Sequence, residues 1–414
     1  MSTPQASKNL IFLTILLAFI LSASFVLAAP ATSAGPRYFI KTSNPFWQKS
    51  LGVRHIFKDG FTSDLSGIQV ALVKIFGIEI EPVEELHILP EEVITETIRK
   101  TIENPNAKPT VNISARTGPS DQTPWGIEVI YNNPVIASTS GGNGINVAVL
   151  DSGVLKTHAD LKNRVKQCKD FTNAKTPIKD GICDDKNGHG THVSGTILAD
   201  GGDDKLGIYG VAPGANLFAY KVCGNSGSCW ADDIAIALKT AADNGSNIIN
   251  MSLGSDNESP LIKDAINYAV SKDVLIVAAG GNDGPYPASI DYPAANKLVM
   301  AVGAIDELLL VPDWSSLGIN SSTSPYIVEE KDMEFGAPGV KVESTWKNGA
   351  YAVLSGTSMS SPHVAGLAAK FWQAGALEGT RAQVTRELLH QLAKDIWIIG
   401  DDNATGFGLP QVSN

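Results

Sequence analysis

Short apolar runs alternate along the chain with longer segments of helical period. Four of the runs have the length of a strand and contain few polar residues: 147–150, 248–251, 274–278 and 298–302. Strands that are apolar on both faces are typical of a parallel sheet covered by helices on each side. The pattern therefore predicts an α/β fold, a three-layer α/β/α domain with a mainly parallel sheet and tight, glycine-rich turns at the strand ends.

The pattern differs in the first part of the chain. Residues 37–42, 53–61, 70–75 and 77–80 are predicted as strands, and residues 91–103 as a charged helix that leads into a polar linker. Residues 37–89 therefore form a separate module in front of the larger domain; the resemblance described below implies that it is a small α+β domain.

An apolar stretch runs from Leu10 to Ala29 behind a short region that contains Lys8. Small residues are frequent at its end, and the segment 26–28 is one candidate cleavage site. These features favour a secretory signal peptide that spans residues 1–29. The stretch is also long enough for an uncleaved membrane anchor. We expect a cleaved signal and a secreted, extracellular protein.

Composition limits the classes of function. The 414 residues are 43% hydrophobic, which is enough for one large core and a smaller module. The net charge of −11 argues against a nucleic acid partner and suits a soluble exported protein.

Four cysteines form two close pairs along the chain, Cys168 with Cys183 and Cys223 with Cys229. An even count in an exported chain predicts two local disulfides, although three connectivities are formally possible and free buried cysteines are an alternative. A zinc site would need pairs of Cys-x-x-Cys spacing, which the sequence lacks.

Three windows carry the candidate chemistry. In GTSMSSPHVAG (356–366), Ser358 stands at a glycine-flanked turn directly before a predicted helix. Free backbone N–H groups and the positive end of the helix dipole lie beside such a serine and can stabilise an oxyanion. A helix N-cap serine is the alternative interpretation.

The second window places Asp151 at the end of a buried strand, in GINVAVLDSGV, where catalytic groups collect in open α/β sheets; a plain turn aspartate is the alternative. The third, NGHGTHVSGT, places His189 and His192 at the start of a helix. A metal pair would need a third ligand, and none stands nearby at ligand spacing. A histidine held between a carboxylate and a serine is the arrangement of a general base.

The order Asp…His…Ser differs from the two other common orders in serine hydrolases. The segments VLDSG, HGTHV and GTSMSSPHVAG resemble the three signatures of the subtilisin-like serine protease family, from about Pro124 to the C-terminus. The resemblance implies a subtilisin-like fold and a serine endopeptidase with the triad Asp151, His189 and Ser358. His189 would take the serine proton during attack on the peptide carbonyl, and an acyl-enzyme would follow.

Further site residues follow from the same resemblance. Asn282, after a buried strand and two glycines, looks like the family's oxyanion-hole asparagine. The facing edge of the substrate groove would lie near residues 224–227. The substrate-binding residues that the resemblance implies are Ser252, Leu253, Gly254, Ala279, Gly280 and Gly281. We expect broad specificity with large apolar side chains favoured; Asp283 would tolerate a basic side chain, but a solvated turn aspartate is the simpler interpretation.

The resemblance also implies a zymogen. Residues 30–120 would be a propeptide that contains the module 37–89, and residues 121–414 the peptidase domain. Family propeptides act as intramolecular chaperone and inhibitor, with the C-terminal tail in the active-site cleft. A permanent accessory domain is the alternative. We expect autoprocessing within the polar stretch 104–120.

A structural Ca²⁺ is implied as well, because hard oxygen ligands suit Ca²⁺ better than Mg²⁺. The ligands would be Asp121, Asp160, Gly202, Asp204, Leu206 and Ile208. A glycine- and aspartate-rich loop that is merely solvated is the alternative.

The expected partners are protein and peptide substrates and the chain's own propeptide, and we expect a monomer. Two interpretations come from other classes. A pseudo-protease that binds peptides without cutting them would lack a triad residue or Asn282. A secreted esterase or lipase would favour a Gly-x-Ser-x-Gly elbow and the order Ser…Asp…His. The sequence shows neither pattern.

Overall fold

The computed structural model describes residues 36–89, 92–95, 118–174, 176–320, 326–373, 375 and 379–413. The signal peptide prediction and most of the predicted linker fall outside these residues. The chain divides into two compact units, residues up to Glu84 with 174–177, and the remainder. None of the described helices combines the length and the hydropathy that a membrane span requires.

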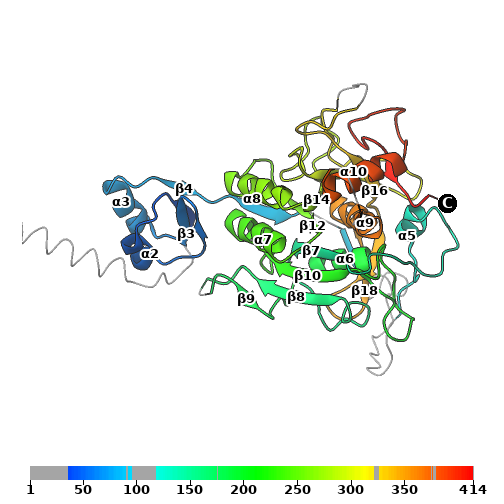
Figure 1. Cartoon of the computed structure of the whole chain (residues 1–414), viewed down its shortest axis with the longest axis horizontal. Coiled ribbons are helices and arrows are strands. Elements are labelled where there is room, and N and C mark those ends of the chain that lie inside the picture. Colours follow the sequence, from blue (N-terminus) through cyan, green and yellow to red (C-terminus); the bar gives the residue numbers. More distant parts are fainter. Residues whose placement is uncertain are drawn as a thin grey trace, which may run out of the picture. The chain divides into compact units, whose positions relative to one another are not determined.

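The first unit is a small α+β fold (Figure 1). Its antiparallel sheet has the strand order β2-β3-β1-β4, and its core is apolar. Its elements are β1 (Arg37–Ile40), α2 (Pro45–Leu51), β2 (Ile56–Phe57), β3 (Gly60–Asp64), α3 (Gly67–Ile75) and β4 (Ile80–Pro82).

The strand predicted at residues 70–75 is wrong, because this segment belongs to helix α3. The Ser66 side chain accepts the Gln69 N–H, and the Gln69 side chain accepts the Ser66 N–H. This capping box satisfies two of the N–H groups that a helix start leaves unpaired. Val70 and Val73 then fall on one helix face and pack against the core of the unit.

The second unit is built on an eight-stranded sheet with the order β16-β15-β14-β12-β7-β10-β8-β9. Neighbouring strands are parallel except β8 and β9. The strands are β7 (Asn146–Asp151), β8 (Val165–Asp170), β9 (Lys179–Asp180), β10 (Asn216–Lys221), β12 (Ile248–Met251), β14 (Leu275–Ala279), β15 (Met300–Ile305) and β16 (Phe335–Pro338). The four strands predicted from apolar runs correspond to β7, β12, β14 and β15.

Helices cover both faces of this sheet, α7 and α8 on one and α6 and α9 on the other (Figure 1). The predicted three-layer α/β/α fold with a mainly parallel sheet is confirmed. The helices of this unit are α5 (Trp125–Ile130), α6 (His189–Leu198), α7 (Ala231–Asp243), α8 (Pro260–Ser271), α9 (Thr357–Lys370) and α10 (Arg381–Leu392).

Strand β7 is the place where the connections change direction. Strands β10 and β12 lie on its two sides, and the chain reaches them by separate crossovers. In open α/β sheets such a switch point leaves a crevice at the carboxyl ends of the strands, where ligands bind. Asp151 is the last residue of β7 and therefore stands at this crevice.

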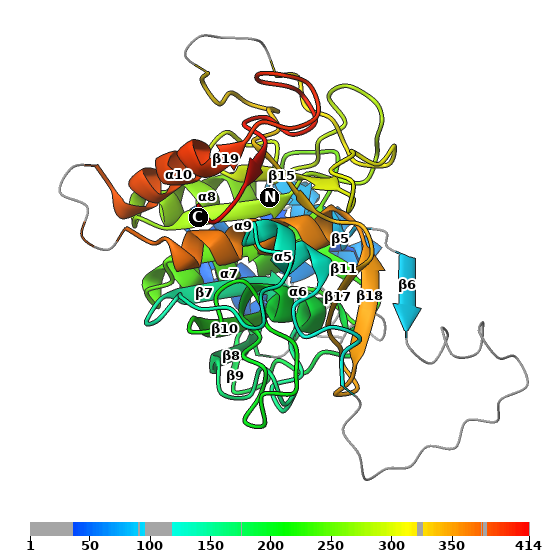
Figure 2. The same cartoon turned by 90° about the vertical axis from the view of Figure 1, so that its right-hand side faces the viewer.

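Three small sheets complete the unit. Strand β5 (Glu85–Ile88) lies between β11 (Ser228–Trp230) and β13 (Leu253–Gly254), and β6 (Glu92–Thr95) pairs with β18 (Tyr351–Ser355), which also pairs with β17 (Val342–Thr345). Figure 2 shows β5 beside β11 and β6 beside β18. The third sheet pairs β19 (Ala393–Lys394) with β20 (Leu409–Pro410).

The helix predicted at residues 91–103 is wrong over Glu92–Thr95, which form β6, while residues 91 and 96–103 lie outside the described part. The charge pattern of the segment favours a helix locally. The open edge of β18 offers backbone groups to a strand, and this tertiary pairing overrides the local preference.

The predicted disulfides are confirmed. Cys168 is bonded to Cys183 and Cys223 to Cys229, which uses all four cysteines of the chain.

Candidate active site

Asp151 and His189 meet at the crevice beside β7. Each is 1% exposed, and His189 Nδ1 lies 2.8 Å from Asp151 Oδ1 and 2.9 Å from Oδ2. Because a carboxylate only accepts hydrogen bonds, Nδ1 carries the proton and Nε2 carries the lone pair of the neutral ring. The contact therefore sets the tautomer that a general base needs.

The backbone around His189 requires a glycine for this contact. A Cβ atom added at Gly190 would lie 2.2 Å from the Gly153 carbonyl oxygen and 3.0 Å from Asp151 Oδ1. Only a residue without a side chain lets α6 begin so close to Asp151. The Ser152 N–H also donates to Asp151 Oδ1, at 2.6 Å.

Asp185 organises the start of α6, a role that the sequence analysis missed. One carboxylate oxygen accepts the Gly188 N–H at 2.7 Å and the Ser152 hydroxyl at 2.9 Å. The other accepts the N–H and the hydroxyl of Thr191 at 3.0 and 2.7 Å. An acidic residue four positions before His189 is the only sequence signal for this network, and it resembles any acidic turn.

Ser358 is the second residue of α9 and is buried. Its hydroxyl donates to the Ser252 backbone carbonyl at 3.3 Å, and the Ser252 hydroxyl lies 3.0 Å from the Ser358 carbonyl oxygen. A serine hydroxyl has one hydrogen to donate, so Ser358 must rotate away from Ser252 to share it with His189. Catalytic hydrogen bonds of this kind often form only with substrate bound.

Asn282 comes three residues after the end of β14. Its Oδ1 accepts the N–H and the hydroxyl of Thr357, at 3.0 and 2.9 Å. With its oxygen used in this way, its NH₂ group points away from Thr357 and is oriented as a donor. The Ser358 N–H belongs to the first turn of α9, where N–H groups have no partner within the helix. Thr357 is therefore an orienting residue that the sequence analysis did not identify.

The predicted substrate edge pairs with another part of this chain. In β13, Leu253 lies opposite Ile88 and Gly254 opposite His87. On the other side β11 pairs with the same strand, and the Ile88 N–H donates to the Gly227 carbonyl at 2.9 Å. The facing edge, expected near residues 224–227, thus begins at Gly227 and continues along β11. Ala279, Gly280 and Gly281, at the end of β14, are buried.

The residues expected to hold Ca²⁺ gather around the loop 201–208. Asp160 is buried, and its Oδ2 accepts the Ile208 N–H at 3.1 Å and the Tyr351 hydroxyl at 2.6 Å. The loop is closed by the Gly201 N–H, which donates to the Ile208 carbonyl at 3.0 Å. Asp204 lies on this loop, with its Oδ1 accepting the Leu206 N–H at 3.1 Å.

Asp121 makes no contact with this loop among the described residues: its Oδ1 accepts the Thr123 N–H at 3.0 Å, and its neighbour Gln122 contacts the loop instead. The Gln122 side chain donates to the carbonyls of Lys205 and Gly207, at 2.8 and 2.9 Å. The carboxylates of Asp160 and Asp204 and the carbonyls of the loop are the donor chemistry that Ca²⁺ prefers, so this part of the predicted ligand set fits the ion.

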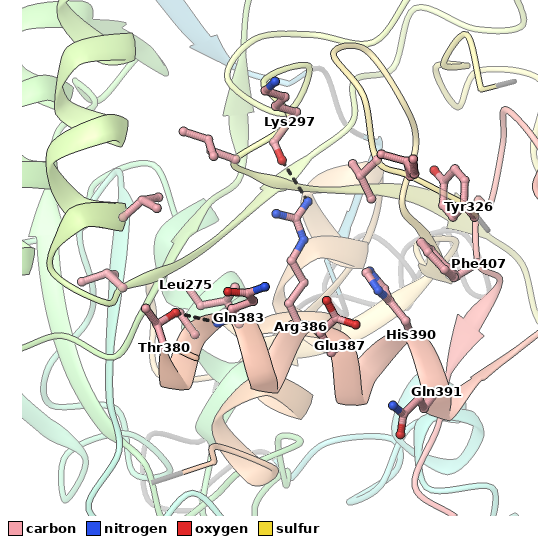
Figure 3. A pocket seen from close by; sticks show the side chains of 16 residues that line it. Leu275, Lys297, Tyr326, Thr380, Gln383, Arg386, Glu387, His390, Gln391 and Phe407 are labelled. Carbon is pink, nitrogen blue, oxygen red and sulfur yellow. Dashed lines mark hydrogen bonds between the residues drawn. The ribbon is translucent and has the colours of Figure 1, made fainter. Parts of the chain in front are cut away.

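A separate pocket of about 770 Å³ lies against α10 (Figure 3). Arg386 points into it and donates to both oxygens of the buried Glu334 at 2.7 and 2.6 Å, and His390 Nε2 lies 2.7 Å from the same carboxylate. Because Glu334 already neutralises Arg386, this cluster is a structural ion pair. The residues that line the pocket include none of the predicted site residues.

Comparison with known proteins finds close relatives. The model of the family described as Subtilase family matches residues 142–408, a range that includes Asp151, His189, Asn282 and Ser358. The chain is 46% identical over 371 residues to a subtilisin of Bacillus sp. (strain TA39), across 86% of this chain and 84% of that protein. It is 37% identical to M-protease of Shouchella clausii (strain KSM-K16), across 73% of this chain and 72% of that protein.

Two solved structures are also similar. Sphericase matches with a TM-score of 0.68 and 51% identity, over 71% of this chain and all of its own. The S41 psychrophilic protease matches with a TM-score of 0.68 and 49% identity, over 72% of this chain and all of its own.

Proposed function

Since the chain belongs to the subtilase family, whose members are serine endopeptidases, we propose that it is a secreted endopeptidase that cuts peptide bonds with Asp151, His189 and Ser358. The observation that carries this proposal is the buried contact between His189 Nδ1 and the two oxygens of Asp151, at 2.8 and 2.9 Å. It leaves a basic Nε2 on a ring that cannot turn freely. Such a histidine can take the proton of a serine as that serine attacks a carbonyl carbon.

The reaction proceeds in two halves. Ser358 turns from the Ser252 carbonyl to His189, gives up its proton and attacks, and His189 returns the proton to the leaving amine. A water molecule then repeats the sequence on the acyl-enzyme. Asn282 Nδ2 and the Ser358 N–H donate to the oxyanion in both halves, because Thr357 holds the amide of Asn282 in the donating orientation.

Substrate binds as an extended strand along Ser252, Leu253 and Gly254. The pairing of β5 with both β11 and β13 supports this, because the gap between these two strands accepts a peptide backbone. Main-chain hydrogen bonds are independent of sequence, so this mode of binding gives broad specificity. Ala279, Gly280 and Gly281 border the side chain next to the cut bond.

Residues 30–120 serve as a propeptide within this proposal, and the chain is a zymogen that processes itself. Support comes from residues 85–88, which occupy the place proposed for substrate. The signal peptide, residues 1–29, exports the chain. A permanent accessory domain would place the same strand there without a later cut, so the two interpretations differ only in maturation.

A bound Ca²⁺ would be held by the carboxylates of Asp121, Asp160 and Asp204 and by the carbonyls of Gly202, Leu206 and Ile208. It would supply positive charge among these oxygens and stabilise the loop 201–208. The reaction itself does not involve this site.

The proposal is tested by exporting the full chain from a bacterial host as wild type, Ser358→Ala and Ser360→Ala. Ser360 is a matched control, because it lies in the same helix, is buried, and its hydroxyl has no hydrogen-bond partner among the described residues. We expect the wild type and Ser360→Ala to lose the N-terminal segment over time and to cleave a peptide substrate, and Ser358→Ala to do neither.

The other outcomes separate the parts of the proposal. If all three chains keep the segment, it is an accessory domain or needs another protease. If all three lose it, the cut is external, and hydrolysis of the peptide substrate alone decides the role of Ser358. Peptide hydrolysis by Ser358→Ala at the wild-type rate would rule out Ser358 as the nucleophile.

A further inference from the structure

The register of β5 locates the side chain that would precede the cut bond, provided that the proposed peptidase function holds. Ile88 lies opposite Leu253, so the next residue, Leu89, comes opposite Ser252. The Ser252 carbonyl accepts the hydroxyl of Ser358 at 3.3 Å. Leu89 therefore occupies the register position of the substrate residue whose carbonyl carbon is attacked.

Three carboxylates gather beside this position. One oxygen each of Asp256, Asp283 and Asp291 lies within 4.8 Å of the others. Asp256 comes two residues after β13, and Asp283 directly follows Asn282. Two of the three therefore border segments that contact substrate or the oxyanion in the proposed function.

Asp291 lies next to two glycines of the proposed substrate site, Gly254 at the end of β13 and Gly281 just after β14. A Cβ atom added at Gly254 would lie 2.8 Å from its Oδ2, and one added at Gly281 would lie 2.9 Å from the same atom. Gly281 also has a φ of +114°, which disfavours any other residue there. The two glycines thus leave room for the carboxylate beside β13 and the end of β14.

The Asp291 side chain is buried but unpaired. The residue is 2% exposed, and across the described part of the chain its carboxylate makes no hydrogen bond or ion pair; only its backbone N–H and carbonyl are bonded, to Gly280 and Ala295. Buried carboxylates normally have a partner, because the loss of hydration on burial is then not compensated by any hydrogen bond or opposite charge. Burial, and then the charges of Asp283 and Asp256, raise its pKa to about 7.

We propose that Asp256, Asp283 and Asp291 bind the cationic head of a lysine or arginine side chain that precedes the cut bond. The apolar stem of such a side chain passes Gly254 and Gly281, and its charge meets the three carboxylates. A basic residue, rather than the large apolar one that the small residues 279–281 suggest from sequence, is then the preferred substrate at this position.

Leu89 agrees with this assignment. It occupies the register position without a charge, so the three carboxylates have no counter-ion among the residues that the structure describes. The chain's own strand binds through its backbone but lacks the cation that a preferred substrate carries. This suits a segment that blocks the site better than one that is quickly cut.

A substrate cation explains the cluster better than a divalent metal does. Ca²⁺ takes six to eight oxygen ligands, and the cluster offers three carboxylates, two of them exposed. A lysine or arginine side chain, carried by a peptide strand that pairs with β13, needs no ligands beyond these carboxylates.

The test measures kcat/KM of the mature enzyme on peptide anilides that are identical except for the residue before the anilide: lysine, arginine, leucine or phenylalanine. We expect the wild type to favour lysine and arginine over leucine by about tenfold or more. Asp291→Asn should lower the ratio of kcat/KM for the lysine peptide to that for the leucine peptide to near one. If Asp291→Asn does not fold, Asp256→Asn and Asp283→Asn, at exposed positions, should each lower the preference.

Several results would overturn the proposal. The wild type could cut the leucine peptide as well as the lysine peptide, or all three variants could keep a basic preference. Ca²⁺ binding that Asp291→Asn abolishes, in an enzyme with no basic preference, would make the cluster a metal site. In each of these cases the wild type still cuts peptides and Ser358→Ala does not, so the proposed function stands. If the wild type cuts none of the peptides, both proposals fail.

Discussion

At the scale of single residues, the contact with Thr357 orients the NH₂ group of Asn282 as a hydrogen-bond donor. Replacing Asn282 by alanine should lower kcat by about 10²–10³-fold and change KM little, since the oxyanion exists only in the transition state. This magnitude is the one known for an oxyanion-hole asparagine of subtilisin itself. Steady-state kinetics on a neutral peptide check it, and an unchanged kcat would remove Asn282 from the site.

Asp291 gives a second prediction, which concerns stability. Its pKa of about 7 means that between about pH 4 and pH 7 the folded chain holds a proton that the unfolded chain has lost. The free energy of unfolding therefore falls as the pH rises through this window. Asp291→Asn carries no such proton, so its Tm relative to the wild type should rise from pH 4 to pH 8.

This comparison is made with both chains in the Ser358→Ala background, so that proteolysis does not intervene. A difference in Tm that stays constant with pH would contradict the raised pKa. Among the described residues, the charges that act on Asp291 are those of Asp283 and Asp256, and both raise its pKa.

Residues that stand in a motif could be proposed as site residues from the sequence. Asp151, His189, Ser358 and Asn282 could be proposed from their windows, and the structure brings Asp151 into contact with His189. Asp185, Thr357 and Asp291 could not be found this way, because each acts on a residue from a distant part of the chain. Nothing in the local sequence separates a turn aspartate from one buried behind two glycines.

At the scale of elements, we expect the two disulfides to have different effects, one on substrate binding and the other on stability. Cys223–Cys229 closes a span of 6 residues and ties down β11, where Cys229 pairs with Leu86. Replacing both cysteines by serine should raise KM for peptides with little change in kcat. Equal KM values for this variant and the wild type would mean that β11 does not depend on the disulfide.

The other disulfide is the matched control. Cys168–Cys183 closes a span of 15 residues, and chain-entropy arguments assign about 3 kcal/mol to a loop of that length. Replacing Cys168 and Cys183 by serine should lower the Tm and leave the KM for peptides unchanged. Thermal unfolding and peptide kinetics on both variants test the pair.

Apolar runs were good predictors of the buried strands and poor predictors elsewhere. Strands β7, β12, β14 and β15 could be predicted because both of their faces are covered by helices. Residues 70–75 are as apolar as a strand, yet the Ser66–Gln69 capping box makes them helical. Strand β6 could not be predicted, because its partner β18 lies more than 250 residues further along.

At the scale of the whole molecule, calcium should stabilise the larger unit. In the Ser358→Ala background, chelation should lower Tm by about 5–10 °C, the shift expected from losing an ion present well above its Kd. Asp160→Asn should show the lower Tm already and respond little to chelation.

Asp203→Asn is the control for this experiment. Asp203 lies on the same loop, but its side chain is exposed and bonds to Lys162 and Asn163. The Asp203→Asn variant should show the same fall in Tm on chelation as the wild type. A Tm that chelation does not move in any variant would mean that the loop 201–208 holds no ion.

The sequence predicts a module over residues 37–89 and a peptidase domain that begins at residue 121. The two compact units of the structure divide at Glu84, because β5 belongs to the sheet formed with β11 and β13. Pairing across such a distance in sequence has no local signal, so its register could only come from the structure.

In the proposed zymogen, the same pairing makes the activity of the enzyme depend on the volume into which it is released. While the chain is intact, residues 85–88 are tethered near β11 and β13, at an effective concentration on the order of millimolar that does not depend on how much protein is present. A cut between residues 104 and 120 turns this into an encounter between two molecules, whose occupancy falls on dilution. Enzyme released into an open medium would shed its inhibitor, while the same cut enzyme in a confined space would stay blocked.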